Sequence, residues 1–435
     1  MNRKIIVNKF GGGILKNDLF PIISKRIKEQ LATGGLPVVV VSAMPGITDK
    51  LLSGGPNYIR ELRDTHYEII SSMGFKKEEL IKLKEEIEKL FDELARRVLK
   101  KTSQRTVLAN EEDRVVSYGE KLSATIIAAY FNSIGIKSKR FLAEEIPIMT
   151  DDHFKNANID YKISEKNIKS KLSGLNVVPV IAGFTGITKK GETTTLGRGG
   201  TDTTACFVGA ALQADKIILW KDVGGVLSAD PKVVKTAKTI PFISYLEAEE
   251  AGKIIHDKAI QYVKMYKTEI EIASITNPKF STKIGEIKKQ GKGAKIVSYK
   301  KDLNLLLITD EVMKVNDLML LVCETFKKYK VEMVLISNTR YSLQIVADKS
   351  DEIEMVYNEI KSKVEEIELI KASMVFLVGN FEAKDVSNFN DLLVKLGTDL
   401  QISAFYFDNC KRIEAVIRTE NIEKVVNSLY KKFIK

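Results

Sequence analysis

The sequence predicts an α/β protein in which a mostly parallel, helix-covered sheet is followed by two small α+β modules. At 435 residues the chain is too long for one ordinary domain. Over residues 1–297, apolar runs that suit strands buried on both faces alternate with helical stretches, which is typical of a parallel sheet. In residues 298–435 a strand–helix–strand–strand–helix order occurs twice, which indicates a repeat.

The first part contains four apolar runs and three helical stretches that justify the predicted sheet. The predicted strands are 4–8, 38–41, 176–183 and 216–220, and the predicted helices are 18–32, 113–134 and 201–213. Ligands of parallel sheets bind outside the carboxyl ends of the strands. We therefore expect the functional residues in the loops that follow these runs.

Residues 57–104 differ from their surroundings. They are rich in Lys and Glu and place apolar residues at helical spacing, which predicts a helical hairpin packed on the core. We assign no chemistry to this hairpin. Its one histidine, His66, is expected on the surface, as is His153.

The second part is predicted as two modules, at about 303–368 and 372–433. Their predicted strands are 303–309, 331–337, 341–347, 373–379, 399–405 and 412–418, and their helices are 316–329, 352–364, 383–396 and 420–433. Each copy spans 60 to 65 residues, roughly the length of one small supersecondary unit. We therefore place a domain boundary between residues 297 and 298.

Composition excludes several classes of protein. The net charge of +11 is spread among 57 acidic residues, which argues against a nucleic-acid surface and favours small anionic substrates. No apolar run is long enough to cross a membrane, and the N-terminus does not have the pattern of a signal peptide. The three cysteines lack metal-site spacing and are expected as reduced thiols of a cytoplasmic protein.

A glycine-rich segment at 193–205 is the most informative local feature. Its three glycines and flanking hydroxyl residues open a helical run, and such loops hold phosphate with unpaired backbone N–H groups. It is neither a Walker A loop nor G-x-G-x-x-G. A flexible turn capped by Thr201 or Asp202 would explain the glycines, but not Arg198 and Asp202 together.

A second glycine loop follows the first predicted strand. Lys9 is followed by Phe10 and by glycines at 11–13, so that a bare backbone and a cation stand side by side. Alone this is a common strand-to-loop pattern. Two such loops in one α/β region indicate a site for an anionic ligand.

The motifs together resemble the aspartate kinases of the amino-acid kinase superfamily. The resemblance rests on motifs in family order at residues 9–12, 40–44 with 46–49, 117–120, 195–202, and 220–223 with 230–232. It covers about residues 1–297 and implies a three-layer amino-acid kinase fold. Residues 298–435 resemble the family's paired regulatory ACT domains, which are ferredoxin-like α+β modules.

This resemblance implies the phosphorylation of L-aspartate to 4-phospho-L-aspartate by MgATP, the first step toward lysine, threonine and methionine. Lys9 is similar to the lysine that reaches the transferring phosphoryl group, and Asp202 is the one side chain expected near Mg²⁺, which otherwise enters on ATP. The residues that the resemblance implies for aspartate are Ser42, Thr48, Glu120, Phe184, Arg198 and Thr201. Those for ATP are Lys9, Gly11, Gly12, Lys221, Asp222, Leu227, Asp230, Lys232 and Lys253.

The ACT resemblance also implies regulation and assembly. A feedback amino acid, lysine above all, is expected at Asn316, Asp317, Leu318 and Ser337. ACT modules pair across chains through strand edges, so a homodimer or higher homo-oligomer is expected through residues 298–435. No membrane or nucleic-acid partner is expected.

Departures from the family pattern keep two alternatives open. Gly13 and Ile14 stand where relatives have two hydroxyl residues, and Leu227 stands where many have a tyrosine. One alternative is a weakly active paralogue that serves as an amino-acid sensor or regulatory subunit. The other is an amino-acid kinase acting on glutamate or a carbamate.

Overall fold

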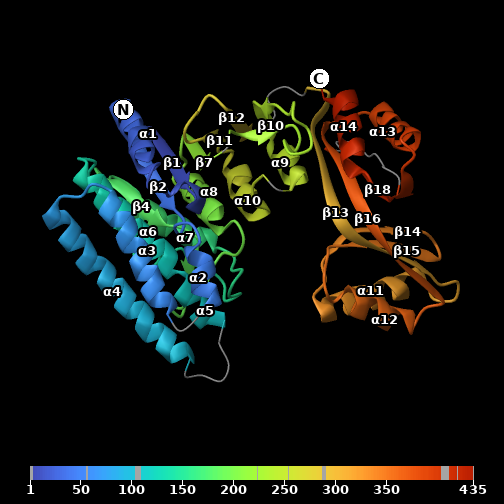
Figure 1. Cartoon of the computed structure of the whole chain (residues 1–435), viewed down its shortest axis with the longest axis horizontal. Coiled ribbons are helices and arrows are strands. Elements are labelled where there is room, and N and C mark those ends of the chain that lie inside the picture. Colours follow the sequence, from blue (N-terminus) through green and yellow to red (C-terminus); the bar gives the residue numbers. More distant parts are fainter. Residues whose placement is uncertain are drawn as a thin grey trace. The chain divides into compact units, whose positions relative to one another are not determined.

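The computed structural model describes residues 3–54, 57–102, 109–222, 224–252, 254–286, 291–402, 411–418 and 420–434, without the side chains of 99–102, 400 and 401. These residues form two compact units (Figure 1). The first comprises Met1–Val226 and Thr239–Lys288, and the second comprises Leu227–Lys238 and Lys289–Lys435. The separation into a catalytic and a regulatory domain at residue 297 stays a prediction.

The first unit is built on an eight-stranded sheet in the order β10-β12-β11-β7-β1-β2-β4-β3. Only the β11–β12 pair is antiparallel, so the predicted mostly parallel sheet is confirmed. Its strands are β1 (Ile5–Phe10), β2 (Leu36–Val41), β3 (Ser138–Phe141), β4 (Val178–Ala182), β7 (Lys216–Lys221), β10 (Phe242–Ser244), β11 (Ile270–Ser274) and β12 (Ser281–Gly285). The short strands are β5 (Thr185–Ile187), β6 (Thr193–Thr195), β8 (Val226–Leu227) and β9 (Thr239–Ile240).

Helices cover both faces of this sheet (Figure 1). They are α1 (Phe20–Ala32), α2 (Ile47–Ser53), α3 (Tyr58–Ser72), α4 (Lys77–Thr102), α5 (Ala109–Val116), α6 (Tyr118–Ser133), α7 (Tyr161–Leu172), α8 (Gly200–Ala211), α9 (Tyr245–Ala251) and α10 (Asp257–Tyr266). Phe10, Val39 and Val41 point toward α1 and α6 in one core cluster. On the opposite face, α8 packs so closely that a Cβ on Gly209 would lie 2.4 Å from Ile217.

Helix α8 is buried along its whole length, from Gly200 to Ala211. A helix that is apolar on all sides needs neighbours on all sides, and α8 has the sheet beneath it and α7 and α10 beside it. The three-layer arrangement therefore fixes the N-terminus of α8 at the carboxyl ends of β1 and β2. This end carries Thr201 and Asp202.

Two local expectations differ from the structure. The predicted helix 113–134 is broken at Ser117 into α5 and α6, so that Glu120 lies in the first turn of α6. His66 was expected on the surface, but it is fully buried on α3 against Phe91 of α4. The Nδ1 of His66 is hydrogen-bonded to the Leu62 carbonyl, at 2.7 Å, which satisfies one of its two ring nitrogens.

The second unit contains one six-stranded antiparallel sheet in the order β14-β15-β13-β16-β18-β17. Its strands are β13 (Gly293–Thr309), β14 (Met333–Asn338), β15 (Ser342–Ala347), β16 (Glu366–Asn380), β17 (Asp399–Ile402) and β18 (Arg412–Arg418). Its helices are α11 (Val315–Tyr329), α12 (Ile353–Lys361), α13 (Ala383–Lys395) and α14 (Ile422–Phe433). The predicted repeat is present, although residues 403–405 of one predicted strand lie outside the described residues.

The two copies of the repeat share their central strands, which the sequence did not predict. β13 and β16 begin at Gly293 and Glu366, well before the predicted starts at 303 and 373, and they pair along most of their lengths. A bulge between Lys300 and Leu303, with Asp302 at a positive φ of 58°, lets β13 continue through the charged residues that precede the predicted strand 303–309. Each copy packs its own helices on its own apolar cluster.

Candidate active site

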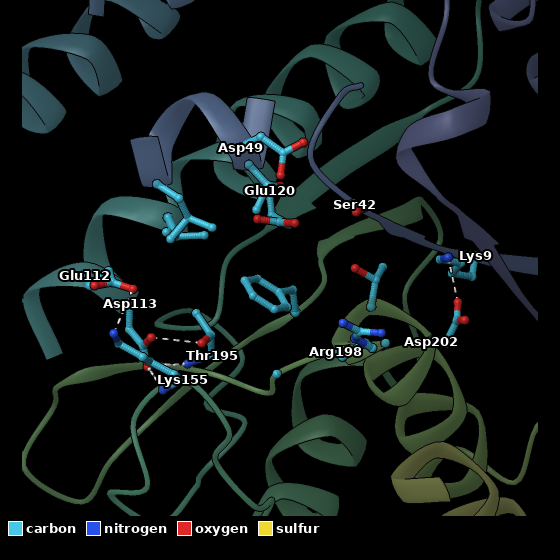
Figure 2. A pocket seen from close by; sticks show the side chains of 18 residues that line it. Lys9, Ser42, Asp49, Glu112, Asp113, Glu120, Lys155, Thr195, Arg198 and Asp202 are labelled. Carbon is cyan, nitrogen blue, oxygen red and sulfur yellow. Dashed lines mark hydrogen bonds and ion pairs between the residues drawn. The ribbon is translucent and has the colours of Figure 1, made fainter. Parts of the chain in front are cut away.

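A pocket of about 600 Å³ opens in the first unit where β1, β2 and β6 end (Figure 2). The segments that line it are far apart in the chain and come from α2, α5, α6 and the loop before α8. Every residue predicted for aspartate lies on its wall, and so do both predicted catalytic residues. The lining residues are Lys9, Ser42, Thr48, Asp49, Leu52, Glu112, Asp113, Val116, Glu120, Lys155, Phe184, Thr195, Gly197, Arg198, Gly199, Gly200, Thr201 and Asp202.

One end of the pocket holds a buried charge cluster. Lys9 on β1 forms an ion pair with Asp202 on α8, with 2.6 Å between Nζ and Oδ1, and Lys221 at the end of β7 approaches the other oxygen at 3.4 Å. Burial alone would raise the pKa of Asp202, but the two lysine charges hold it below its usual value. Asp202 is therefore an anion between two cations, which is a suitable environment for a phosphate group.

Glu120 lies on the opposite wall, near Asp49 (Figure 2). Its Oε1 accepts a hydrogen bond from the Ala43 N–H at 2.9 Å, whereas its buried Oε2 has no hydrogen-bond partner among the described residues. Burial raises the pKa of Glu120 to about 8, and the hydrogen bond from Ala43 counteracts this only in part. An acceptor oxygen without a donor that faces a pocket is suited to an incoming ammonium group.

The backbone of its loop positions Arg198, whereas its side chain makes no fixing contact with the described residues. The flanking Gly197 and Gly199 have positive φ values of 76° and 72°, a conformation that glycine adopts without steric cost. The guanidinium is exposed and forms no hydrogen bond or ion pair within the described part of the chain. It is therefore available to a carboxylate or phosphate ligand, and its position depends on the loop that carries it.

Phe184 adopts a strained backbone in the same pocket. Its φ of 68° is unusual for a bulky residue. The Thr204 hydroxyl accepts the Phe184 N–H at 3.0 Å, and the Phe184 carbonyl accepts the Leu196 N–H at 2.9 Å, so both backbone groups are fixed. The ring packs over Gly200, where a Cβ would lie only 2.6 Å from Cδ2. The strain thus places an aromatic wall beside Thr201.

A polar group at the far end of the pocket was not predicted from the sequence. Asp113 on α5 is 2% exposed and accepts hydrogen bonds from the Thr195 N–H, the Thr195 hydroxyl and the Lys155 N–H at 2.8 to 2.9 Å. Burial raises the pKa of its carboxyl, and these donors counteract the effect. Glu112 forms an ion pair with Lys155 at 3.0 Å. Locally, Glu112 and Asp113 look like part of a charged, solvated helix face, and no local pattern distinguishes them.

The residues predicted for ATP fall in both units. Gly11 lies against Lys9, because a Cβ at Gly11 would be 2.9 Å from the lysine Nζ, and Gly12 approaches the Ala43 carbonyl closely. Lys221 reaches Asp202, and Asp222 follows it directly. Leu227, Asp230 and Lys232 belong to the second unit, and Lys253 lies outside the described residues. The nucleotide role of these residues stays a prediction.

The predicted effector residues lie at the start of α11 and on β14. Asn316 and Asp317 are exposed in the first turn of α11, and Ser337 is half-buried on β14. Leu318 is fully buried in the apolar cluster of its module, so its side chain packs inward. Binding of an effector at these positions stays a prediction.

The described residues contain no cluster of three or more His, Cys, Asp or Glu side chains that could hold a metal ion. A single carboxylate, that of Asp202, borders the Lys9 end of the pocket. This fits Mg²⁺ that is held mainly by substrate phosphates. Among the helices described here, none is long and apolar enough to cross a membrane.

The chain is similar to known proteins of one family. The model of the amino acid kinase family matches residues 4–274. The chain is 28% identical to an aspartokinase of Rickettsia felis over 99% of both chains. It is 31% identical to an aspartokinase of Rickettsia bellii, over 72% of this chain and 68% of that protein.

The fold also matches solved structures. The structure of Escherichia coli aspartokinase III in complex with aspartate and ADP has a TM-score of 0.82 at 22% identity, and the match covers 99% of this chain and 100% of that one. The same enzyme with lysine and aspartate has a TM-score of 0.81 at 22% identity and equal coverage. This likeness establishes a common fold over both units.

Proposed function

Because the chain belongs to the aspartokinases of the amino acid kinase family, we propose that it transfers the γ-phosphoryl group of ATP to the side-chain carboxylate of L-aspartate. The observation that carries this proposal is the convergence of Lys9, Glu120, Arg198 and Asp202 on one pocket. Two cations and two carboxylates there match a substrate with two carboxylates and one ammonium group. We place the enzyme in the cytoplasm, where ATP is available.

In the proposed reaction, an oxygen of the aspartate side chain attacks the γ-phosphorus while the bond to the β,γ-bridging oxygen breaks, so that 4-phospho-L-aspartate and ADP form. Arg198 binds the α-carboxylate and Glu120 the ammonium group, which leaves the side-chain carboxylate toward Lys9. Lys9 leaves Asp202 in part to neutralise the charge of the phosphoryl group in the transition state. Ser42, Thr48 and Thr201 supply neutral hydrogen bonds, and Phe184 limits the length of the acceptor.

Mg²⁺ bound to ATP would neutralise phosphate charge, and Asp202 is the pocket residue placed to hold it directly or through water. Lys221 would then be the remaining cation beside Asp202, since Lys9 is needed at the phosphoryl group. The residues present therefore fit a metal that arrives with its nucleotide.

The weakly active paralogue is the less favoured reading. Ile14, at one of the departures, is 2% exposed in the apolar core, and a Cβ at Gly13 would meet no atom within 4 Å. These two positions change the surroundings of the glycine loop and leave Lys9, Glu120, Arg198 and Asp202 of the pocket in place. A glutamate acceptor would be one methylene longer between Arg198 and Lys9.

The function is tested by ATP turnover with purified protein. ADP release should depend on L-aspartate, and hydroxylamine should trap the acyl phosphate as the hydroxamate. L-Glutamate serves as the control acceptor and is expected to react at least tenfold more slowly, because one extra methylene is worth about 10- to 200-fold in a fitted site. Absence of aspartate-dependent ADP at millimolar substrate would contradict the proposal.

The second unit is proposed to join copies of the chain. β14 is an edge strand of the six-stranded sheet and is half or fully exposed from Met333 to Asn338. Unpaired strand edges associate readily. We expect a homodimer or larger assembly in light scattering at micromolar concentration. Removal of residues 289–435 should yield a monomeric or poorly soluble first unit, and a monomeric full-length chain would contradict this prediction.

Feedback inhibition by lysine is proposed through the first copy of the repeat. The exposed carboxylate of Asp317 lies in the first turn of α11, near the polar Asn316, and it favours a cationic amino acid. L-Lysine should inhibit the aspartate-dependent rate, whereas L-threonine and L-methionine should act weakly, and Asp317→Asn should reduce lysine inhibition. No inhibition up to about ten millimolar lysine, above the usual millimolar range of weak binding, would reject this proposal.

A further inference from the structure

We propose that Asp113 is a positioning residue that fixes the Arg198 loop for binding the acceptor's α-carboxylate. This inference rests on the proposed function. It starts from a buried carboxylate at the far end of the pocket that the reaction itself does not use (Figure 2).

Asp113 joins two loops that are distant in sequence. One of its oxygens, Oδ2, accepts the Thr195 N–H and the Lys155 N–H, each at 2.8 Å, and its Oδ1 accepts the Thr195 hydroxyl at 2.9 Å. The loops also contact each other directly, because the Ala157 N–H donates to the Thr195 carbonyl at 2.9 Å. The Asp113 side chain on α5 therefore adds a second link between the two loops.

The hydrogen bond to Asp113 holds the Lys155 backbone in an unfavourable conformation. Its φ of 69° lies in the left-handed region, which is unfavourable for a lysine. Asp113 holds the N–H of this residue and the adjacent Glu112 holds its side chain, at 3.0 Å from Nζ. The two neighbouring acids of α5 thus fix the strained residue at both ends.

The fixed loops carry Arg198. Thr195 is followed by Leu196, Gly197 and Arg198, and Gly197 packs so closely on Asn156 that a Cβ would lie 2.6 Å from its Oδ1. Since no described side chain holds the Arg198 guanidinium, the backbone of this loop decides where it lies. Loss of the Asp113 carboxylate should therefore displace the Arg198 side chain.

The experiment compares Asp113→Ala and Asp113→Asn in the full-length protein. We expect an increase of at least tenfold in the KM for aspartate, a change of kcat of less than threefold, and an unchanged KM for ATP. Asp113→Asn keeps one oxygen acceptor but turns an amide group toward backbone donors. Its KM for aspartate should therefore lie between those of Asp113→Ala and the wild type. Thr195→Val removes only the hydroxyl group that donates to Asp113, so it should raise the KM for aspartate by a smaller factor.

The double variant with Arg198→Ala separates positioning from general structural support. If Asp113 acts through Arg198, then Asp113→Ala should change the aspartate KM less than twofold when Arg198 is already absent. Asp160→Asn is the matched control, because Asp160 also accepts a backbone N–H, that of Ile163, but lies outside the pocket. It should leave both KM values unchanged.

Two results would overturn the inference. One is that Asp113→Ala still raises the KM for aspartate tenfold in the Arg198→Ala background, because the two substitutions would then act independently. The other is an equal rise of the ATP and aspartate KM values, which would indicate general damage to the site. If the wild-type protein shows no aspartate-dependent turnover, the proposed function fails instead. Calorimetric titration of aspartate into Asp113→Ala and Arg198→Ala then tests the positioning role by binding alone.

Discussion

Replacing Lys9 by methionine is expected to lower kcat by about 10²- to 10³-fold, with a much smaller change in the KM for aspartate. The reason is that a cation aimed at the transferring group interacts most strongly with the transition state, and removal of one such group has an effect of this size. Lys9 is 7% exposed and lies 2.6 Å from Asp202, so no solvent cation replaces it easily. Steady-state kinetics with varied aspartate and ATP measure the effect.

The Lys9 variant also leaves Asp202 with only one nearby cation. Loss of the shorter ion pair should lower the free energy of unfolding by up to about 3 kcal/mol, since an unpaired buried charge is destabilising. The double variant Lys9→Met/Asp202→Asn removes that charge and should recover stability but not activity. Lys16→Met is the control, because Lys16 is exposed and lies outside the pocket. A kcat for Lys9→Met within threefold of the wild type would contradict the assignment.

Replacing Glu120 by glutamine is expected to raise the KM for aspartate by about 10- to 100-fold, the usual effect of losing a hydrogen bond to a charged group. The KM for ATP should stay unchanged. Glutamine keeps the Oε1 acceptor for the Ala43 N–H at 2.9 Å, so the fold around α6 should be retained. The variant therefore removes the charge at Oε2, which has no partner among the described residues.

The pH dependence gives a second readout of Glu120. Its pKa is raised to about 8 in the free protein, chiefly by burial, so below pH 8 the neutral form dominates. Binding of the ammonium group requires the charged form, and aspartate binding must then release a proton. The KM for aspartate should fall about tenfold per pH unit as the pH rises toward 8 and level off above it. Glu120→Gln should abolish this slope, and a wild-type KM that does not vary between pH 6 and 8 would contradict the role.

The sequence predicted that residues at the ends of strands would lie together, and the structure brings such residues to one pocket. Lys9 lies near the end of β1, and Ser42 and Thr48 come after β2. Carboxyl ends of neighbouring parallel strands meet at one edge of a sheet, so motifs hundreds of residues apart can be placed together from their order alone. The glycine loop with Arg198 and Asp202 could be assigned for the same reason, since it opens a helix that the apolar pattern shows to be buried.

The sequence could not predict partners that depend on the packing of separate elements. Asp113 is 82 residues from Thr195 and 42 from Lys155, and its helix has the composition of an exposed surface. His66 sits among Lys and Glu residues and was placed on the surface, yet α4 covers it. Local composition reports the average polarity of a segment, whereas the burial of one side chain depends on which element packs on it.

The fold class and the positions of most elements were therefore determined by the sequence alone, because the periodicity of apolar residues records which faces are buried. The tertiary structure decided which strands are shared between the two copies of the repeat. β13 and β16 each serve both copies of the repeat, because a bulge carries β13 past Lys300, Lys301 and Asp302 into the strand predicted from residue 303. It also grouped residues 227–238 with the second unit and closed the pocket with Asp113. Hydrogen bonds between distant segments form only when the whole chain has packed, and no local pattern encodes them.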